Sequence, residues 1–204
     1  MEISPIASYP LMEHYYTIQG EGYNSGKPCY FIRLGGCDVG CVWCDVKNSW
    51  NAKAHPLVGT DVMLDFVQSS NAQTVVITGG EPLMYDLTRL TTPFKTAGIK
   101  TFLETSGAYP LTGNWDWICV SPKKFKEPLP EVVSKAHELK VIVYNKTDFA
   151  WGEKYAALAT EECKLFLQPE YSVFDKVMPL IVDFVKQNPR WRISLQSHKF
   201  MGIE

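Results

Sequence analysis

The sequence predicts an α/β fold built on a largely parallel sheet. Short runs rich in β-branched and aromatic residues recur along the chain, and amphipathic segments of helical period separate several of them. This alternation is typical of βα units whose helices cover a parallel sheet. No repeat, low-complexity tract or Gly/Ser-rich linker divides the 204 residues, so one compact domain spanning 1–204 is expected.

The predicted strands are Tyr30–Leu34, Thr74–Thr78, Thr101–Glu104, Trp117–Val120, Lys140–Val143, Lys164–Leu167 and Arg192–Leu195. The predicted helices, each with one apolar face, are Thr60–Gln68, Leu83–Ala97 and Tyr171–Gln187. Thr60 is a candidate N-cap of the first helix, and Gly98 is a candidate terminator of the second.

Three stretches rich in turn-forming residues are predicted to lie outside these elements, at 20–28, 48–59 and 121–130. The last contains three prolines and three lysines and is interpreted as a loop that follows a strand. The stretch 48–59 is a variable excursion that forms either a surface cap or a dimer contact, and the sequence does not decide between them.

Composition narrows the class of partner. The chain is 46% hydrophobic and 21% charged, with a net charge of −2 and no run of like charges. A surface for nucleic acid is therefore not expected, and a small-molecule partner is favoured. No apolar stretch approaches the roughly 20 residues that cross a bilayer, and acidic Glu2 precedes Pro5 where a signal peptide would be basic and then apolar. We expect a cytoplasmic protein without a membrane partner.

The cysteines are unevenly placed. Cys37, Cys41 and Cys44 fall within eight residues, a spacing typical of metal or redox ligands and not of a disulfide framework. The other cysteines stand alone in apolar or strand-like surroundings and are predicted to be small buried side chains; they are Cys29, Cys119 and Cys163.

The cysteine loop, residues 35–45, is the strongest chemical signal. Its glycines permit the backbone to wrap tightly around a cubane whose irons bind three thiolates. No further cysteine lies in the loop, so one iron is left open. An open iron can chelate the amino and carboxylate groups of S-adenosylmethionine (SAM), and one electron then cleaves the sulfonium to a 5′-deoxyadenosyl radical. The alternative is a structural zinc site with His55 as fourth ligand, although only one Cys-x-x-Cys pair is present.

Polar loops follow three of the predicted strands. The turn Thr78-Gly79-Gly80-Glu81-Pro82 resembles the glycine-rich motif by which radical SAM proteins hold the amino group of SAM. Glu104 and Ser106 end the next strand with groups suited to ribose hydroxyls, and Ser121 and Lys123 follow the strand after it. Helix capping or turn formation is the alternative role of these four residues.

Further motifs extend nearly end to end: Thr17-Ile18-Gln19-Gly20-Glu21-Gly22, Gly26-Lys27-Pro28, Phe31-Ile32-Arg33-Leu34 and Leu195-Gln196-Ser197-His198-Lys199-Phe200. Together with the cysteine loop they resemble the 7-carboxy-7-deazaguanine synthase (QueE) family. That resemblance implies a modified partial TIM-like barrel of the radical SAM type and a homodimeric lyase that depends on a protein electron donor such as flavodoxin or ferredoxin. The implied reaction converts 6-carboxy-5,6,7,8-tetrahydropterin to 7-carboxy-7-deazaguanine with loss of ammonia, in the pathway to queuosine and other 7-deazapurines.

The resemblance also implies site residues. The [4Fe-4S] ligands are the three clustered cysteines. SAM contacts are expected at Trp43, Asp45, Gly80, Glu81, Glu104, Ser106, Ser121, Lys123 and Gln168. Substrate contacts are expected at Ile18, Gln19, Gly20, Arg33, Thr78 and Glu204. Trp43 is suited either to packing on the adenine or to shielding the cluster. Arg33 is the leading partner for the substrate carboxylate, because a guanidinium binds a carboxylate through two parallel hydrogen bonds.

The family mechanism, as the resemblance implies it, begins with hydrogen abstraction from C6 of the pterin and ends with regeneration of SAM, with Mg²⁺ holding the substrate carboxylate. Here the chain departs from the pattern. Val46 follows Asp45, where family members often have a hydroxyl that contacts magnesium. Magnesium is therefore expected with Asp45 as a nearby oxygen and with no assigned protein ligand.

Two rival functions share part of this pattern. A glycyl-radical activase has the cysteine spacing but acts on a partner protein, and Gln19 and Arg33 argue against it. A zinc-binding interaction module would need no SAM and no cluster.

Overall fold

The computed structural model describes residues 6–203, and within them one continuous sheet of nine strands runs in the order β3-β1-β2-β4-β5-β6-β7-β8-β9. The strands are β1 Ser8–Ile18, β2 Pro28–Leu34, β3 Leu57–Gly59, β4 Thr74–Gly79, β5 Lys100–Thr105, β6 Trp117–Val120, β7 Glu138–Val143, β8 Lys164–Pro169 and β9 Trp191–Ile193. β1 pairs antiparallel with β2 and with β3, and every pair from β2 to β9 is parallel.

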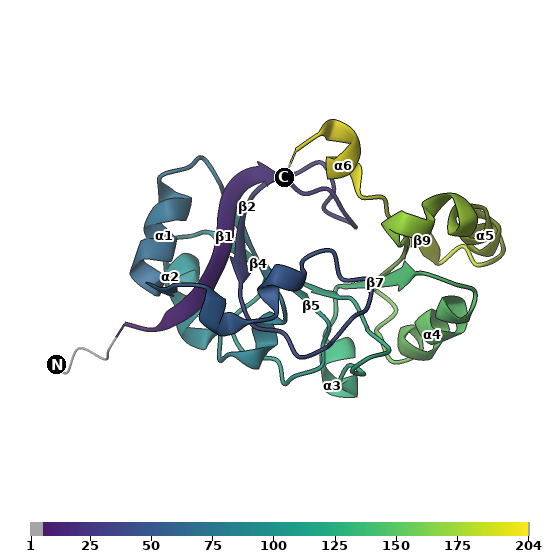
Figure 1. Cartoon of the computed structure of the whole chain (residues 1–204), viewed down its shortest axis with the longest axis horizontal. Helices are drawn as coiled ribbons and strands as arrows, with labels where there is room; N and C mark the ends of the chain where they lie inside the picture. Colours follow the sequence, from purple (N-terminus) through teal and green to yellow (C-terminus); the bar gives the residue numbers. More distant parts are fainter. Residues whose placement is uncertain (1–5, 204) are drawn as a thin grey trace.

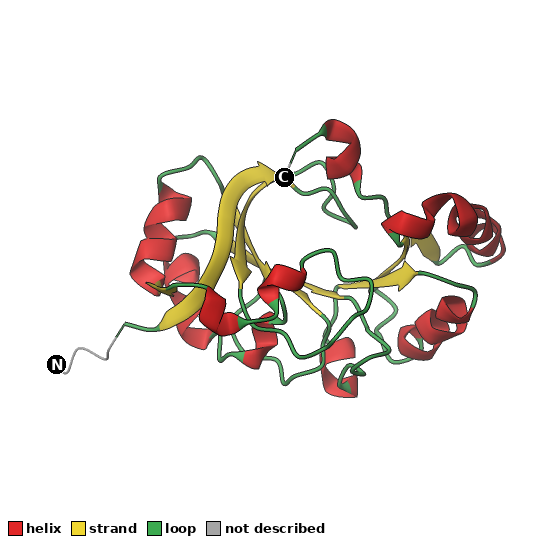
Figure 2. Ribbon diagram, in the orientation of Figure 1, coloured by secondary structure: helices red, strands yellow, loops and turns green. Residues whose placement is uncertain are grey.

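The sheet curves into an arc, and most helices lie on its outer side (Figures 1 and 2). These helices are α1 Thr60–Gln68, α2 Thr88–Thr96, α3 Pro130–Val133, α4 Thr147–Ala156 and α5 Phe174–Gln187. The last helix, α6 Ser197–Met201, lies instead near the end of β1, across the open side of the arc (Figure 1). A curved parallel sheet with outer helices is a partial TIM-like barrel, which confirms the predicted fold class.

Side chains alternate between the two faces of each strand. On β2, Ile32 and Leu34 are fully buried against the outer helices, whereas Phe31 and Arg33 point into the arc. The same register on the neighbouring strands buries an apolar core, formed by residues such as Val75, Ile77, Leu103, Leu139, Val141 and Leu167. The opposite faces of these strands therefore supply the lining of the arc.

The predicted strands and the predicted helix at 60–68 are all present, with small differences in their ends. The predicted N-cap was wrong, because Thr60 is the first residue of α1 and Gly59 occupies the cap without a side-chain bond. The helix predicted from Leu83 is divided into a 3₁₀ turn, Pro82–Met84, and α2, which Gly98 follows with a positive φ. A 3₁₀ turn also precedes α5, at Tyr171–Val173.

None of the helices within residues 6–203 is both long and apolar enough to span a membrane. The predicted Cys29, Cys119 and Cys163 are buried free thiols, in agreement with the sequence interpretation.

Candidate active site

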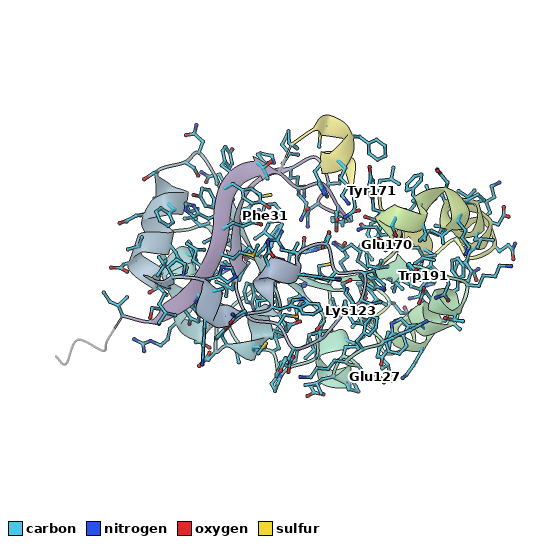
Figure 3. The ribbon with its side chains drawn as sticks, viewed as in Figure 1. Phe31, Lys123, Glu127, Glu170, Tyr171 and Trp191 are labelled. Carbon is cyan, nitrogen blue, oxygen red and sulfur yellow. The ribbon has the colours of Figure 1, made fainter. Side chains whose placement is uncertain are left out.

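A cavity of about 290 Å³ opens at the carboxyl ends of the parallel strands. Among the residues proposed from the sequence, those within 6–203 line this cavity with one exception, Glu81. They are Ile18, Gln19, Gly20, Arg33, Cys37, Cys41, Trp43, Cys44, Asp45, Thr78, Gly80, Glu104, Ser106, Ser121, Lys123 and Gln168. Glu204 lies outside the described residues. The side chains of the surrounding elements are drawn in Figure 3, where Phe31 lies on β2, and Lys123 and Tyr171 follow β6 and β8.

The cysteine loop follows β2 and is held by backbone hydrogen bonds from two directions. Gly36 N–H donates to the carbonyl of Ser49 (2.6 Å), and Cys37 N–H donates to that of Trp50 (3.2 Å). On the other side, Glu81 N–H donates to the carbonyl of Gly36 (2.8 Å). The excursion at 48–59 therefore holds the cysteine loop through these hydrogen bonds. It also adds β3 to the edge of the sheet.

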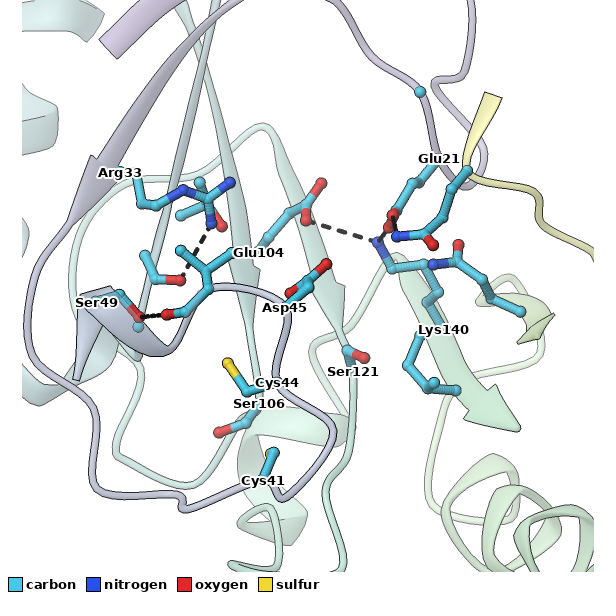
Figure 4. A pocket seen from close by; sticks show the side chains of 18 of the residues that line it. Glu21, Arg33, Cys41, Cys44, Asp45, Ser49, Glu104, Ser106, Ser121 and Lys140 are labelled. Carbon is cyan, nitrogen blue, oxygen red and sulfur yellow. Dashed lines mark hydrogen bonds and ion pairs between the residues drawn. The ribbon is translucent and has the colours of Figure 1, made fainter. Parts of the chain in front are cut away.

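The three thiols fit an iron–sulfur cluster better than a zinc ion. Cys37, Cys41 and Cys44 all line the cavity, and Figure 4 shows Cys41 and Cys44 near Ser106. Yet no group of three or more Cys, His, Asp or Glu side chains among the described residues is arranged to hold one metal ion. Zinc requires its ligands to converge on a single point, whereas each thiolate of a cubane binds a different iron.

The glycine-rich turn after β4 approaches the cysteine loop so closely that a side chain has no room. A Cβ on Gly80 would lie 2.3 Å from the carbonyl oxygen of Gly36 and 2.7 Å from Cβ of Cys37. The backbone of the turn thus lies directly against Cys37, the first cysteine of the loop.

Glu81 differs from the prediction in where its carboxylate points. It is buried and accepts hydrogen bonds from the N–H of Leu83 (3.0 Å), the hydroxyl of Thr105 (2.5 Å), and the N–H and hydroxyl of Ser106 (2.7 and 2.5 Å). Because these donors occupy both carboxylate oxygens, the side chain ties the end of β4 to the end of β5 and does not face the cavity. The sequence motif indicated the turn correctly but not the direction of this side chain.

A cation and an aromatic ring lie beside the thiols. The Lys123 ammonium donates to the carbonyl and hydroxyl oxygens of Ser121 (2.8 and 2.5 Å) and lies 5.7 Å from the centroid of the Trp43 ring. Burial lowers the pKa of Lys123. This mixture of a cation, hydroxyls and an aromatic face matches the carboxylate, ribose and adenine groups of SAM.

Arg33 lies on β2, inside the sheet and not on an edge strand. Its Nε donates to Oε1 of Glu13 (2.5 Å), and Nη1 lies 3.4 Å from the carbonyl oxygen of Gly79. Burial would by itself lower the pKa of Arg33, but its hydrogen bond to Glu13 raises it, so the guanidinium is charged at the cavity wall. The sequence did not indicate Glu13 as its counter-ion.

The structure adds four lining residues to those assigned a role from the sequence: Lys140, which sequence reasoning missed, and Glu21, Gln196 and His198, which lie in the family motifs. Figure 4 shows Glu21, Lys140 and Glu104 together, apart from Cys41 and Cys44. One signal was available for Lys140, because a lysine within an otherwise apolar strand requires a buried counter-charge. The counter-charges come from distant segments and could not be identified by spacing.

Three thiols on the loop after the first parallel strand, at the carboxyl edge of a partial barrel, define a radical SAM enzyme. The family model for a 4Fe-4S single cluster domain matches residues 18–110. A 7-carboxy-7-deazaguanine synthase from Flavobacterium psychrophilum is 56% identical over 194 residues, covering 95% of this chain and 92% of the relative. The synthase of Synechocystis is 42% identical over the full length of both chains.

A solved structure agrees with these relatives. The crystal structure of QueE from Escherichia coli superposes with a TM-score of 0.82 at 31% sequence identity, covering 94% of this chain and 95% of that one. The chain therefore belongs to the 7-carboxy-7-deazaguanine synthase family. The predicted lyase class, the [4Fe-4S] cluster and SAM are confirmed by this membership, whereas the magnesium ion stays a prediction.

Proposed function

We propose that the chain converts 6-carboxy-5,6,7,8-tetrahydropterin to 7-carboxy-7-deazaguanine with loss of ammonia, in the biosynthesis of queuosine and other 7-deazapurines. The observation that carries this proposal is that three clustered thiols and the Arg33 guanidinium line one cavity. Full-length relatives that bear the name of this synthase support it. When bound, the cluster and SAM supply the one-electron chemistry that removes hydrogen from the substrate.

The cofactor end of the cavity is formed by the cysteine loop and the loops after β4 and β6. Cys37, Cys41 and Cys44 each hold one iron. We place the backbone of Gly80 against the amino acid part of SAM and the Lys123 ammonium near its carboxylate, with Trp43 covering this end. Ser106, Ser121 and Gln168 stay proposed SAM contacts.

The substrate end is formed by the turn after β1 and by the first parallel strands. Ile18, Gln19 and Gly20 line the cavity, and we place this turn against the pterin edge, which carries both donors and acceptors. Thr78 lies beside them, and Glu204 stays a proposed contact from the sequence. Glu104 accepts a hydrogen bond from Gln19 (2.8 Å), so we place its carboxylate between the two ligands.

A divalent cation in this site would find few side-chain oxygens on the cysteine loop. Asp45 lines the cavity, and Val46 beside it has no donor atom in its side chain. We propose that the substrate carboxylate and Asp45 hold the ion, with water completing its ligands.

Arg33 tests the substrate assignment. If the guanidinium pairs with the substrate carboxylate, Arg33→Ala removes a charge-assisted contact worth roughly 2–5 kcal/mol, and Arg33→Lys removes part of it. We expect KM for the carboxypterin to rise in that order. Cleavage of SAM without substrate should be unchanged, because the cysteine loop does not use this side chain. Both activities are measured in the same anaerobically reconstituted samples.

Glu13→Gln is the matched control, since it removes the negative partner but keeps an acceptor for Arg33. Its KM should stay near that of the parent. Equal turnover by Arg33→Ala and the parent would show that Arg33 does not bind the carboxylate. A parent that cleaves SAM but never converts the carboxypterin would refute the proposed reaction.

The assembly and the electron source are also proposals. We propose a homodimer reduced by a flavodoxin or ferredoxin, on the basis of the family, and light scattering of the reconstituted enzyme tests the dimer. The buried free cysteines support the proposed cytoplasmic location, where thiols stay reduced.

A further inference from the structure

A closed ring of polar side chains lies at the substrate end of the cavity. Lys140 pairs with Oε2 of Glu21, and its ammonium lies 3.6 Å from Oε2 of Glu104. Oε1 of Glu104 accepts from the Gln19 side-chain amide (2.8 Å). The side-chain Oε1 of Gln19 in turn accepts from the backbone N–H of Glu21 (3.2 Å), which closes the ring.

Lys140 is the only member of this ring that carries a positive charge. It points inward from β7, and 4% of the residue is exposed. Burial would lower the pKa of Lys140, but the carboxylates of Glu104 and Glu21 raise it well above its usual value. Without the ammonium, the two partly buried carboxylates would lose their shared counter-charge, which is unfavourable.

The ring also holds the C-terminal segment. Oε1 of Glu21 accepts from the side-chain amide of Gln196 (2.9 Å). One residue later, the N–H and hydroxyl of Ser197 both donate to the carbonyl of Gly20 (2.9 and 2.8 Å). His198 packs so closely on Gly20 that a Cβ there would lie 2.3 Å from its Nδ1.

Lys140 therefore connects the elements that surround the substrate end. The turn after β1, the end of β5, the interior of β7 and the segment before α6 all meet through its two carboxylate partners. The ion pairs of Lys140 are made with Glu21 and Glu104, whereas the cysteine loop is held by Ser49, Trp50 and Glu81.

We propose that Lys140 is a positioning residue for substrate binding: by fixing Glu21 and Glu104 it keeps the Gln19–Gly20 turn and the Gln196–His198 segment in place around the substrate. This inference rests on the proposed function for the identity of the substrate. Of the ring, Glu104 borders the cofactor end, because its carboxylate is placed between the two ligands.

The test is Lys140→Met, which keeps the length of the side chain and removes its charge. We expect KM for the carboxypterin to rise by roughly tenfold or more, because the turn loses its anchor. Iron content and cleavage of SAM without substrate should stay within about twofold of the parent. A merely structural role would raise KM and would also lower the iron content and the cleavage of SAM, and that result would overturn the proposal, as would an unchanged KM.

Two further variants keep the test decisive. Glu21→Gln breaks the ion pair without burying an unpaired carboxylate, so it should fold even where Lys140→Met does not. It should raise KM severalfold, and an unchanged KM overturns the proposal. Lys124→Met is the matched control, because that exposed lysine pairs with Asp148 outside the cavity and should leave KM unchanged.

Hydrogen exchange separates this inference from the proposed reaction, because it needs no substrate. In Lys140→Met, backbone amides of residues 17–22 and 194–200 should exchange faster, whereas those of the cysteine loop should not. A parent that fails to convert the carboxypterin refutes the reaction alone. Unchanged exchange in both segments refutes the positioning role alone.

Discussion

At the scale of single residues, the direction in which a side chain points depends on neighbours that are remote in sequence. Glu81 illustrates this, since its donors Thr105 and Ser106 lie at the end of another strand. Arg33 illustrates it as well, since Glu13 faces it from β1. The residue types and their positions after strands were predictable, because parallel strands bring their carboxyl ends to one edge. The hydrogen-bond and ion-pair partners of these side chains could not be predicted, because they do not follow from spacing along the chain.

Glu81→Gln tests whether hydrogen bonds to the Glu81 carboxylate link the end of β4 to the end of β5. An amide nitrogen cannot accept from Ser106 or Thr105, so at least one buried donor would face another donor, at a cost of roughly 1–3 kcal/mol. We expect the free energy of unfolding in urea to fall by this amount. SAM binding should also weaken, because Ser106 lines the cavity.

Glu161→Gln serves as the control for this change, because Glu161 is exposed and should show neither effect. Weakened SAM binding with an unchanged free energy of unfolding would contradict this linking role. It would indicate that the Glu81 carboxylate contacts SAM directly.

At the scale of elements, the sequence predicted the strands that contain short β-branched and apolar runs and missed β1 and β3. β1 carries Glu13 and His14 within its length and has no clean alternation of buried and exposed residues, and only its residues 8–10 pair with β3. α4 was missed because Gly152 weakens the helical signal. That glycine is explained by packing, since a Cβ there would lie 3.1 Å from the Trp191 ring.

The close approach of the β4 turn to the cysteine loop can be tested by adding a side chain at Gly80. Gly80→Ala would place a methyl group against the backbone of Gly36, which cannot move without displacing Cys37. We expect the reconstituted variant to bind less than roughly one tenth of the iron of the parent, since one thiolate leaves its position. Iron and sulfide analysis after anaerobic reconstitution measures this.

Gly98→Ala is the matched control for Gly80→Ala. Gly98 has a φ of +75° with open space around its Cβ position, so alanine adds backbone strain of about 1 kcal/mol without a clash. It should lower stability slightly and leave the iron content unchanged. Full iron loading in Gly80→Ala would show that the turn does not constrain the loop.

At the scale of the whole molecule, the apolar core and the charged cavity occupy opposite faces of the same strands. On β7, Leu139 and Val141 pack toward the helices, whereas Lys140 points inward. The partners of the inward charges come from both ends of the chain, and Glu21 and Gln196 are 175 positions apart. Local patterns predicted the parallel part of the sheet and three of its outer helices, but only closure of the arc brings these charges together.

This long-range charge pairing predicts how the stability of the whole molecule depends on pH. Burial would raise the pKa of Glu21, but Lys140, helped by Gln196 and His198, lowers it to about 2, below the usual value of 4.5. A carboxylate with a lowered folded-state pKa contributes stability above its unfolded pKa, and that contribution is lost as pH falls toward the folded value. The free energy of unfolding should therefore decrease by about 2 kcal/mol between pH 6 and pH 3 through Glu21 alone.

Urea denaturation of the parent, Glu21→Gln and Glu162→Gln at steps between pH 6 and pH 3 measures this contribution. Glu21→Gln should begin less stable at pH 6, because Lys140 loses an ionised partner, but it should lose less stability on acidification. Glu162 is exposed, so its variant should follow the parent through the whole range. Parallel curves for all three proteins would mean that the Glu21–Lys140 pair contributes nothing to folding across this pH range. The ring at the substrate end would then be a consequence of the fold and not one of its supports.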